Sequence, residues 1–369
     1  MKQLIIRSIL GILICFYSIT SKSQRVYTFA GNGIDSLVNG KGKNASFGKC
    51  FGIGSDKNGN LYIPDTYNNV IRKIDSKGIV STFAGSGKFG NNDGMANEAE
   101  FSEPAGAYVD HHGNVFIADW GGNKIRKINS KGIVSTIAGL DSTGYVNGNK
   151  EVAMFCAPRS CCVDEDGNIY VGDCWNHSVR KITPDGIVSN LAGGGQPYVY
   201  FNKGSWKDGT GTYALFDAPC GVAVDKYGNV YVADANNNKI RKITSKGVVT
   251  TIAGSVDNEG KTTGLKDGVV DSAMLWVPTE LVIDDEGYLF IGDSYNNCVR
   301  MLTPDGFLYT IAGNGEKGYK DGKHSVCDSP RGVTLIGKNL YFFDYNNNRV
   351  RYIKNPKAIL KKKRNAFKP

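Results

Sequence analysis

A unit of four short apolar segments occurs six times along this chain of 369 residues, and it constrains the fold more than any other feature. The fullest copy, residues 221–254, reads GVAVDKYGNVYVADANNNKIRKITSKGVVTTIAG. Its β-branched and aromatic runs are separated by Asp, Asn and Gly, as antiparallel strands joined by tight turns require. A single four-stranded unit cannot bury both of its faces, so the copies are expected to pack against one another.

An aspartate closes the second segment of each copy, and an arginine follows seven residues later. The aspartates are separated by 54, 54, 61, 59 and 51 residues. This period, with four strands per copy, predicts an all-β, six-bladed β-propeller of four-stranded antiparallel blades. Because the pair recurs in every copy, we interpret it as a charge-assisted scaffold contact and not as catalytic. The pairs are Asp65/Arg72, Asp119/Arg126, Asp173/Arg180, Asp234/Arg241, Asp293/Arg300 and Asp344/Arg351.

The two ends of the repeat region complement each other. The sixth copy stops after Tyr352-Ile353 and lacks a fourth segment, whereas a matching segment, VYTFAG, stands alone at residues 26–31. We therefore expect the N-terminal strand to complete the last blade, which would close the ring and leave no open sheet edge.

The sequence GVAVDKYGNVYVADANNNKIRKI resembles the NHL repeat, and the resemblance extends over roughly residues 25–354. Members of that family form six-bladed propellers, so the resemblance implies the same fold. The family includes RNA-binding and protein-binding domains, extracellular adhesion modules and a metal-dependent lyase. It therefore implies little about the chemistry of this chain.

The pattern of residues 1–23 differs from the repeats: a basic start is followed by an apolar run and small polar residues. This pattern predicts a secretory signal peptide, followed by the propeller over residues 24–354 and a basic tail over residues 355–369. No other apolar stretch is long enough to cross a bilayer, so we expect no transmembrane segment. The expected location is secreted or periplasmic.

The positive charge of the chain is concentrated at its ends. Of the net charge of +9, +3 lies in residues 1–23 and +7 in residues 354–369, which leaves −1 for the propeller. A nucleic-acid-binding propeller would be expected to carry a basic face, so nucleic acid is not a predicted partner. The tail is either a solvated end or a segment with weak affinity for an anionic surface.

The best candidate site is the face that carries the loops after the second strands. Aromatic residues follow the repeat aspartate in five of the six copies, surrounded by asparagines. Rings with amides suit a glycan, peptide or protein ligand, although the rings could instead pack against neighbouring loops. The aromatic residues are Tyr67, Trp120, Trp175, Tyr295 and Tyr345, and the rim amides are Asn68, Asn176, Asn236, Asn237, Asn296, Asn346 and Asn347.

Departures from the repeat also occur on the innermost strands, just after a recurring proline. Arg159 and Arg331 stand directly after it, and Glu280 stands one position further on, where other copies have Gly or Ser. We place all three near the mouth of the central channel, either as an ion-paired rim or as a polar anchor for a ligand. The insertion at residues 194–213, with Tyr198, Tyr200, Phe201 and Trp206, could form a lip over this mouth.

The enzymatic alternative is a calcium-dependent hydrolase or lyase, similar to a lactonase, at the channel mouth. Glu280 would be its likeliest carboxylate, and the recurrent Asp-Gly turns between blades are weak candidates for calcium. The four histidines stand at unrelated positions and no G-x-S-x-G motif occurs, so no catalytic or metal-binding residue is assigned. We expect no obligatory cofactor and favour a binding module.

Eight cysteines follow the predicted signal peptide. An even number in an exported protein is compatible with disulfides, whose connectivity the sequence does not determine. Cys156 and Cys174 belong to the third copy's share of the same face, and we take them as the hypothesised pair.

Overall fold

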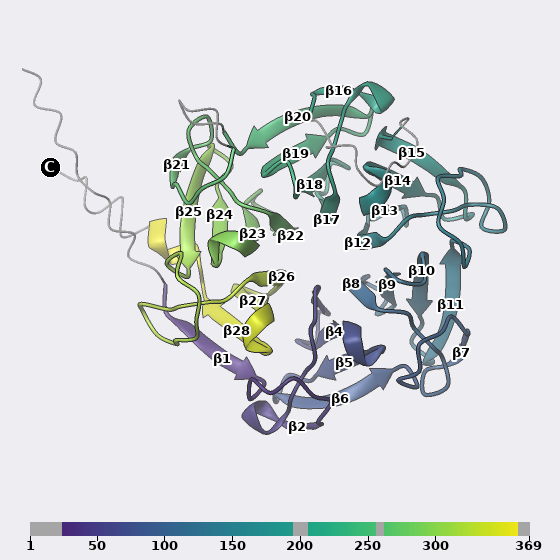
Figure 1. Cartoon of the computed structure of the whole chain (residues 1–369), viewed down its shortest axis with the longest axis horizontal. Helices are drawn as coiled ribbons and strands as arrows, with labels where there is room; N and C mark the ends of the chain where they lie inside the picture. The colour runs from purple at the N-terminus through teal and green to yellow at the C-terminus, as the bar shows by residue number, and fades with distance from the viewer. Residues whose placement is uncertain (1–23, 195–205, 256–261, 361–369) are drawn as a thin grey trace, which may run out of the picture.

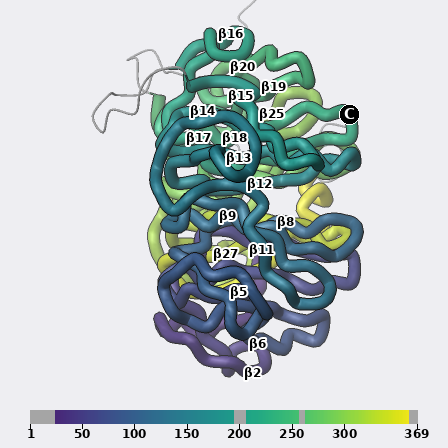
Figure 2. The backbone as a smooth tube through the Cα atoms, turned by 90° about the vertical axis from the view of Figure 1, so that its right-hand side faces the viewer, coloured from purple at the N-terminus to yellow at the C-terminus, as the bar shows by residue number. Residues whose placement is uncertain are grey.

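The computed structural model describes residues 24–194, 206–255 and 262–360, which form six antiparallel sheets arranged as a ring around a central axis (Figure 1). The predicted six-bladed β-propeller is confirmed. Viewed from the side, the blades form one layer (Figure 2). Strands β8, β12, β17, β22 and β26 lie nearest the axis. Strands β6, β11, β15, β20 and β25 lie toward the outside, and the two-residue strands β2, β7, β16 and β21 pair with the outer edge of four of them.

The blades follow the chain order, and each is described from the inner to the outer strand. Blade 1 contains β3 (Gly54–Ser55), β4 (Leu61–Asp65), β5 (Val70–Ile74), β6 (Ile79–Ala84) and β2 (Gly40–Lys41). Blade 2 contains β8 (Pro104–Val109), β9 (Val115–Asp119), β10 (Lys124–Ile128), β11 (Ile133–Ala138) and β7 (Gly94–Met95). Blade 3 contains β12 (Pro158–Val163), β13 (Ile169–Asp173), β14 (Ser178–Ile182) and β15 (Val188–Gly193).

The second half of the ring repeats this arrangement. Blade 4 contains β17 (Pro219–Val224), β18 (Val230–Asp234), β19 (Lys239–Ile243), β20 (Val248–Ala253) and β16 (Gly209–Thr210). Blade 5 contains β22 (Pro278–Ile283), β23 (Leu289–Asp293), β24 (Cys298–Leu302), β25 (Phe307–Ala312) and β21 (Gly268–Val269). Blade 6 contains β26 (Pro330–Ile336), β27 (Asn339–Asp344), β28 (Arg349–Lys354) and β1 (Val26–Ala30).

Blade 6 is completed by the N-terminal strand, as the sequence predicts. Strand β1 pairs antiparallel with β28, with Val26 opposite Ile353 and Thr28 opposite Arg351. Val26 and Ala30 are fully buried, each in a different apolar cluster of this part of the ring. The strand therefore closes the ring both by backbone hydrogen bonds and by burial of its side chains.

The repeat arginine anchors the connection between blades to the blade that follows it. Arg241, for example, donates from Nη1 to Asp234 (2.7 Å) and to the Leu215 carbonyl (2.9 Å). Its Nη2 donates to Asp208 (2.8 Å), the first residue of an Asp-Gly turn. The equivalent turn residues accept from the other repeat arginines, so the recurring Asn-Gly and Asp-Gly pairs are explained. They are Asn39, Asp93, Asn147, Asp267 and Asp321.

A second recurring contact joins five of the six blades to the next one along the chain. The residue four positions after the repeat aspartate has a left-handed backbone, with φ between 47° and 55°, and is Asn in five blades and His177 in blade 3. Asn297 is typical: its Oδ1 accepts the backbone N–H of Ser329 in blade 6 at 3.0 Å. His177 accepts from Ala218 through Nδ1 at 3.2 Å. We call this contact the inter-blade clasp.

The innermost strands of neighbouring blades lie close together at the second residue after the recurring proline. A Cβ on Gly106 would lie 2.7 Å from the backbone oxygen of Arg159, and one on Gly221 would lie 2.6 Å from the Cα of Glu280. Only glycine fits such contacts. Ser160 and Glu280 are the two side chains found at this level.

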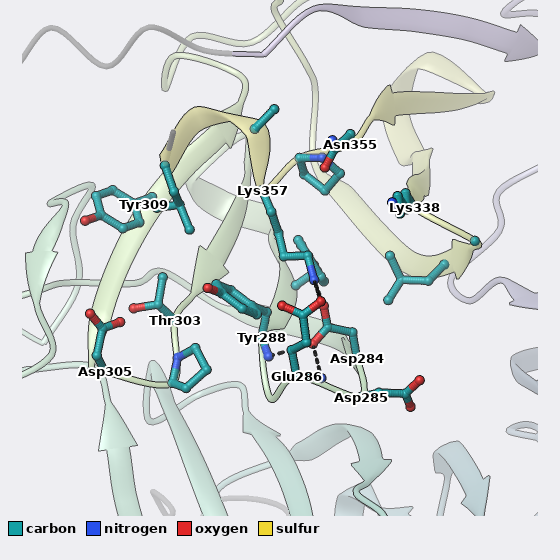
Figure 3. Close-up of a pocket in the computed structure, with 17 residues that line it drawn as sticks. Asp284, Asp285, Glu286, Tyr288, Thr303, Asp305, Tyr309, Lys338, Asn355 and Lys357 are labelled. Carbon is teal, nitrogen blue, oxygen red and sulfur yellow. Dashed lines mark hydrogen bonds and ion pairs between the residues drawn. The ribbon is translucent and has the colours of Figure 1, made fainter. Parts of the chain in front are cut away.

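Beyond β28 the chain turns back onto blades 5 and 6. Ile359 is 2% exposed within an apolar cluster, and Lys357 Nζ pairs with Asp284 (2.8 Å) and Glu286 (2.7 Å), as Figure 3 shows. This segment lines a pocket of about 790 Å³. Within the ranges that the structure describes, no helix combines the length and apolar character needed to span a membrane.

Candidate functional site

Four aromatic rings form a continuous arc around the channel mouth. The ring centroids of Trp175 and Trp120 lie 6.0 Å apart, and those of Trp120 and Phe51 lie 6.1 Å apart, both with edge-to-face geometry. Phe51 stacks on Tyr345 at 5.2 Å. We call these residues the aromatic arc; it runs over blades 3, 2, 1 and 6. Such edge-to-face and stacked pairs stabilise each other and fix the ring orientations.

The loops that present these rings are shaped by the repeat. In four blades the second strand is followed by a single 3₁₀ turn, and the aromatic residue lies in it. The turn ends at the left-handed Asn or His of the inter-blade clasp. These turns are η2 (Thr66–Asn68), η3 (Cys174–Asn176), η5 (Ser294–Asn296) and η6 (Tyr345–Asn347); η1 (Gly42–Asn44) and η4 (Gly211–Tyr213) lie in the connections between blades.

The five predicted aromatic residues differ in exposure. Tyr67 (56%), Tyr295 (53%) and Trp175 (38%) are exposed, whereas Trp120 and Tyr345 are half-buried. Packing and an exposed surface, the two alternatives left by the sequence, are therefore both present. Trp276, which sequence reasoning missed, is 42% exposed and packs edge-to-face against Tyr295 at 5.7 Å.

Two arginines from opposite blades of the propeller reach the aromatic arc. Arg159 extends from β12 in blade 3, and its Cζ lies 3.6 Å from the ring centroid of Phe51. Arg331 extends from β26 in blade 6, with its Cζ 3.7 Å from the centroid of Tyr345 and 4.7 Å from that of Phe51. The structure therefore brings both predicted arginines to the mouth. Phe51 is central to this contact, and sequence reasoning did not select it.

An ion-paired rim, one of the two alternatives that the sequence leaves open, is not formed by these arginines. Among the described residues, the Arg159 guanidinium makes no ion pair or hydrogen bond, and Arg331 makes one long bond, from Nε to Ser329 Oγ at 3.5 Å. Burial and, to a smaller extent, the positive charge of Arg159 lower the pKa of Arg331 to about 10. The positive charge at the mouth is thus only weakly compensated by the protein.

Glu280 lies deeper in the channel than the arginines. Its Oε1 accepts a hydrogen bond from Ser160 Oγ at 2.8 Å. Gly221 lies between the two strands and has no side chain that would block this contact. Burial raises the pKa of Glu280 to about 8, although the Ser160 hydrogen bond acts in the opposite direction. Both residues line a cavity of about 400 Å³ that extends toward the far face. Glu280 therefore belongs to the channel interior.

Most of the predicted amide rim is structural, which corrects the sequence interpretation. The asparagine three residues after the repeat aspartate donates to that aspartate, as Asn176 does to Asp173 at 2.8 Å. Asn68, Asn237, Asn296 and Asn347 do the same. Asn236 and Asn346 are exposed, and each donates to a nearby carboxylate, Asp217 and Asp328. The rings and arginines thus dominate the face.

The proposed Cys156–Cys174 disulfide does not match the structure. Cys174 Sγ lies 3.8 Å from Cys220 Sγ, and all eight cysteines of the described chain are free thiols. Cys174, Cys220 and Ala235 form a cluster of small side chains on blades 3 and 4. Small side chains therefore take the place of large rings where blades 3 and 4 meet.

Metal ligands are not evident in the part of the chain that the structure describes. There, no three His, Cys, Asp or Glu side chains gather as a metal site would require. The aspartates of the Asp-Gly turns, which the sequence offered for calcium, accept hydrogen bonds from the repeat arginines. Tyr198, Tyr200 and Phe201 of the predicted lip lie outside the described residues, and Trp206 packs with Lys239 Nζ at 4.3 Å from its ring.

The pocket of Figure 3 is distant from this mouth. It is lined by the turns after β22 and β24, including Asp284 and Asp305, and by the segment after β28. These turns join the opposite ends of the strands from those that carry the aromatic arc.

Fold and repeat together define a six-bladed propeller built from NHL-like units, and comparisons with known proteins agree. Residues 88–148 match the Teneurin NHL domain and residues 155–182 match the NHL repeat. "Protein SUPPRESSOR OF QUENCHING 1, chloroplastic" of Arabidopsis thaliana is 30% identical over 284 residues, 73% of this chain and 26% of the relative. Bovine "NHL repeat-containing protein 2" is 29% identical over 79% of this chain and 44% of its own length.

The chain thus carries NHL repeats within a six-bladed β-propeller. It spans less than half the length of these two relatives. Among solved structures, an auxiliary nutrient binding protein from Bacteroides thetaiotaomicron matches with a TM-score of 0.65 and 18% identity, over 90% of this chain and 76% of that one. A gluconolactonase from Xanthomonas campestris matches with a TM-score of 0.57 and 14% identity, over 90% and 89%. At these identities the likeness concerns the fold.

Proposed function

We propose that this protein is an exported binding module that takes a glycan or peptide ligand on the aromatic arc. The observation that supports the proposal most is the continuous arc from Trp175 to Tyr345, bordered by the exposed rings of Tyr67 and Tyr295. Large exposed rings gathered on one face are typical of interaction surfaces. Export rests on the signal-peptide pattern of residues 1–23.

Two further points favour binding over catalysis. One solved structure with this fold is described as an auxiliary nutrient binding protein, which shows that the architecture can serve that role. The calcium-dependent hydrolase or lyase expected as the alternative has less support. Glu280 accepts a hydrogen bond from Ser160, and among the described residues no three His, Cys, Asp or Glu side chains gather around one point, as a calcium site would require.

The experiment is a glycan and peptide array screen of the protein, followed by titration of Trp120→Ala and Trp175→Ala. Each substitution should weaken binding by about 1–3 kcal/mol, as at interface hot spots. Tyr227→Ala is the matched control, because Tyr227 is 74% exposed in the β17–β18 turn on the opposite face. Thermal melts separate the two roles: lower stability with unchanged affinity would show that the rings are packing residues.

A further inference from the structure

The chain uses arginine in two different ways, and the difference points to the chemistry of the ligand. The repeat arginines are fully buried, and both terminal nitrogens of each donate hydrogen bonds to protein oxygens. Arg241, for example, donates to two carboxylates, Asp234 and Asp208, and to two backbone carbonyls. This is the usual environment of a structural buried guanidinium, whose charge must be compensated.

Arg159 and Arg331 have the opposite environment. Both Cζ atoms lie within 5 Å of the Phe51 ring centroid, at 3.6 and 4.7 Å, although their strands come from opposite blades. Their planes are held by aromatic rings and not by carboxylates. A guanidinium that stacks on a ring keeps its N–H donors at the edge available for a planar anion.

Other charges near the mouth do not compensate the pair. Lys49 Nζ lies 5.3 Å from the centroid of Tyr345 and adds a third cation. Asp217 and Asp328 lie on the same face and accept hydrogen bonds from Asn236 and Asn346. Glu280 is engaged by Ser160 deeper in the channel. The described part of the mouth therefore has guanidinium donors for an anion and no carboxylate that occupies them.

We propose that the mouth recognises an acidic saccharide, with Arg159 and Arg331 binding the carboxylate of a uronate residue. This inference rests on the proposed function and narrows its ligand class. Arginine binds carboxylates through two parallel hydrogen bonds, which supplies orientation as well as energy. The sugar ring would lie against the aromatic arc, whose apolar ring faces suit the C–H face of a pyranose.

The surroundings favour a saccharide over an acidic peptide. Exposed rings continue away from the arginine pair as Tyr67 on blade 1 and as Tyr295 with Trp276 on blade 5. Such a series of rings around one anion site suits an oligomer of rigid rings that repeats its apolar faces. An acidic peptide is the competing ligand in the test.

The experiment titrates the protein with oligogalacturonides and with glucuronate oligomers, against neutral oligosaccharides of equal length, acidic peptides, and acetate and sulfate alone. Binding is followed by calorimetry at 0.05 and 0.5 M NaCl. We expect the acidic sugars to bind at least ten-fold more tightly than the neutral ones, and the high salt to weaken them. Arg159→Gln and Arg331→Gln should each reduce affinity for the acidic sugars ten- to hundred-fold, whereas Arg25→Gln, an exposed position beside β1, should not change it.

Each outcome decides the inference. Equal binding of neutral and acidic sugars, unaffected by the arginine variants, would overturn the anion site and leave the proposed binding function intact. Preference for acidic peptides, or binding of acetate and sulfate as tightly as of the oligomers, would overturn the saccharide. Binding of no member of the glycan and peptide arrays would refute the proposed function itself.

A stability measurement guards against variants that misfold. Because Arg331 loses solvation and faces Arg159 without a carboxylate partner, Arg331→Gln should leave the melting temperature of the free protein unchanged or raise it. Arg241→Gln should lower it, because two carboxylates lose their partner. A strong loss of stability in Arg331→Gln would assign that residue to the scaffold and contradict the proposal.

Discussion

The Sγ atoms of Cys174 and Cys220 lie 3.8 Å apart, on neighbouring blades beneath the channel mouth. The hydrogen bond between the two sulfurs raises the pKa of Cys174 and lowers that of Cys220. Arg159 and Arg331 also lower the pKa of Cys220, whereas burial opposes them. Cys220 is therefore the thiol of this pair that more readily forms a thiolate, the species that attacks a disulfide.

We predict that oxidised glutathione links Cys174 to Cys220. One cysteine attacks the glutathione disulfide and forms a mixed disulfide, which releases one glutathione thiol. The other cysteine then displaces the second glutathione, so the two protein thiols give two electrons and two protons to glutathione, whose disulfide is reduced to two thiols. Peptide mapping without reduction should identify this link, and the closed protein should gain about 2–4 kcal/mol of stability. Cys174→Ser is the control. Recovery of Cys156 linked to Cys174, or of both thiols free after treatment, would contradict the prediction.

The cysteines show where sequence reasoning stops. Repeat positions place Cys156 and Cys174 in the same blade and on the same face, but the sulfur next to Cys174 is that of Cys220, from the following blade. Repeat spacing gives the level of a residue along the axis. It does not give the direction of a side chain between blades, which depends on packing of both neighbours.

The scaffold, in contrast, can be predicted from the repeat spacing. Strand pairing, ring closure by residues 26–31 and the structural role of Asp234 and Arg241 all follow from positions that recur in the sequence. Phe51 could not be selected from the sequence, because its position on the innermost strand varies among the copies and its importance arises from two arginines that reach it across the mouth. The sequence suggests a ligand-binding amide rim, because it does not reveal that most of these asparagines donate to the repeat aspartate.

Deletion of β1 tests the closure of the ring. A chain beginning at Asn32 should lose its single cooperative melting transition or aggregate, because β28 would expose an unpaired edge and two apolar clusters would lose Val26 and Ala30. A chain beginning at Gln24 is the control. Thermal melts and size-exclusion chromatography measure both. Identical melts of the two chains would show that β1 contributes little to closure.

Glu280 should make stability depend on pH. Burial raises its pKa from 4.5 to about 8, so the folded protein favours the protonated carboxyl group. The resulting stabilisation is fully present below pH 4.5 and is lost as the pH rises through 8. Relative to the wild type, Glu280→Gln should therefore gain about 3 kcal/mol of unfolding free energy between pH 5 and pH 8.

Urea unfolding at the two pH values measures this difference. Glu98→Gln is a matched control at an exposed position and should show no such gain. Three neighbouring groups also act on the pKa of Glu280: the Ser160 hydrogen bond and the charge of Arg159 lower it, and Cys220 raises it. A pH-independent difference between Glu280→Gln and the wild type would mean that the carboxylate is ionised in the folded protein.

The inter-blade clasp is missing at the junction where the ring closes. Asn297 Oδ1 accepts from Ser329 at 3.0 Å, and its Nδ2 donates to the Gly315 carbonyl at 3.1 Å. The equivalent Asn348, in blade 6, has a buried Oδ1 without a partner in the described structure and one long bond, from Nδ2 to the Gly33 carbonyl at 3.4 Å. The two residues have nearly the same left-handed backbone, with φ of 53° and 47°.

Substitution of each asparagine by glycine isolates the clasp, because glycine adopts this backbone without strain. Asn297→Gly removes two short hydrogen bonds and leaves the Ser329 N–H without its acceptor, so we expect a loss of about 1–3 kcal/mol. Asn348→Gly removes no comparable contact and should cost clearly less. Chemical denaturation of the two variants measures the difference directly. Equal losses would show that the clasp adds nothing to stability and that the left-handed turn alone is required.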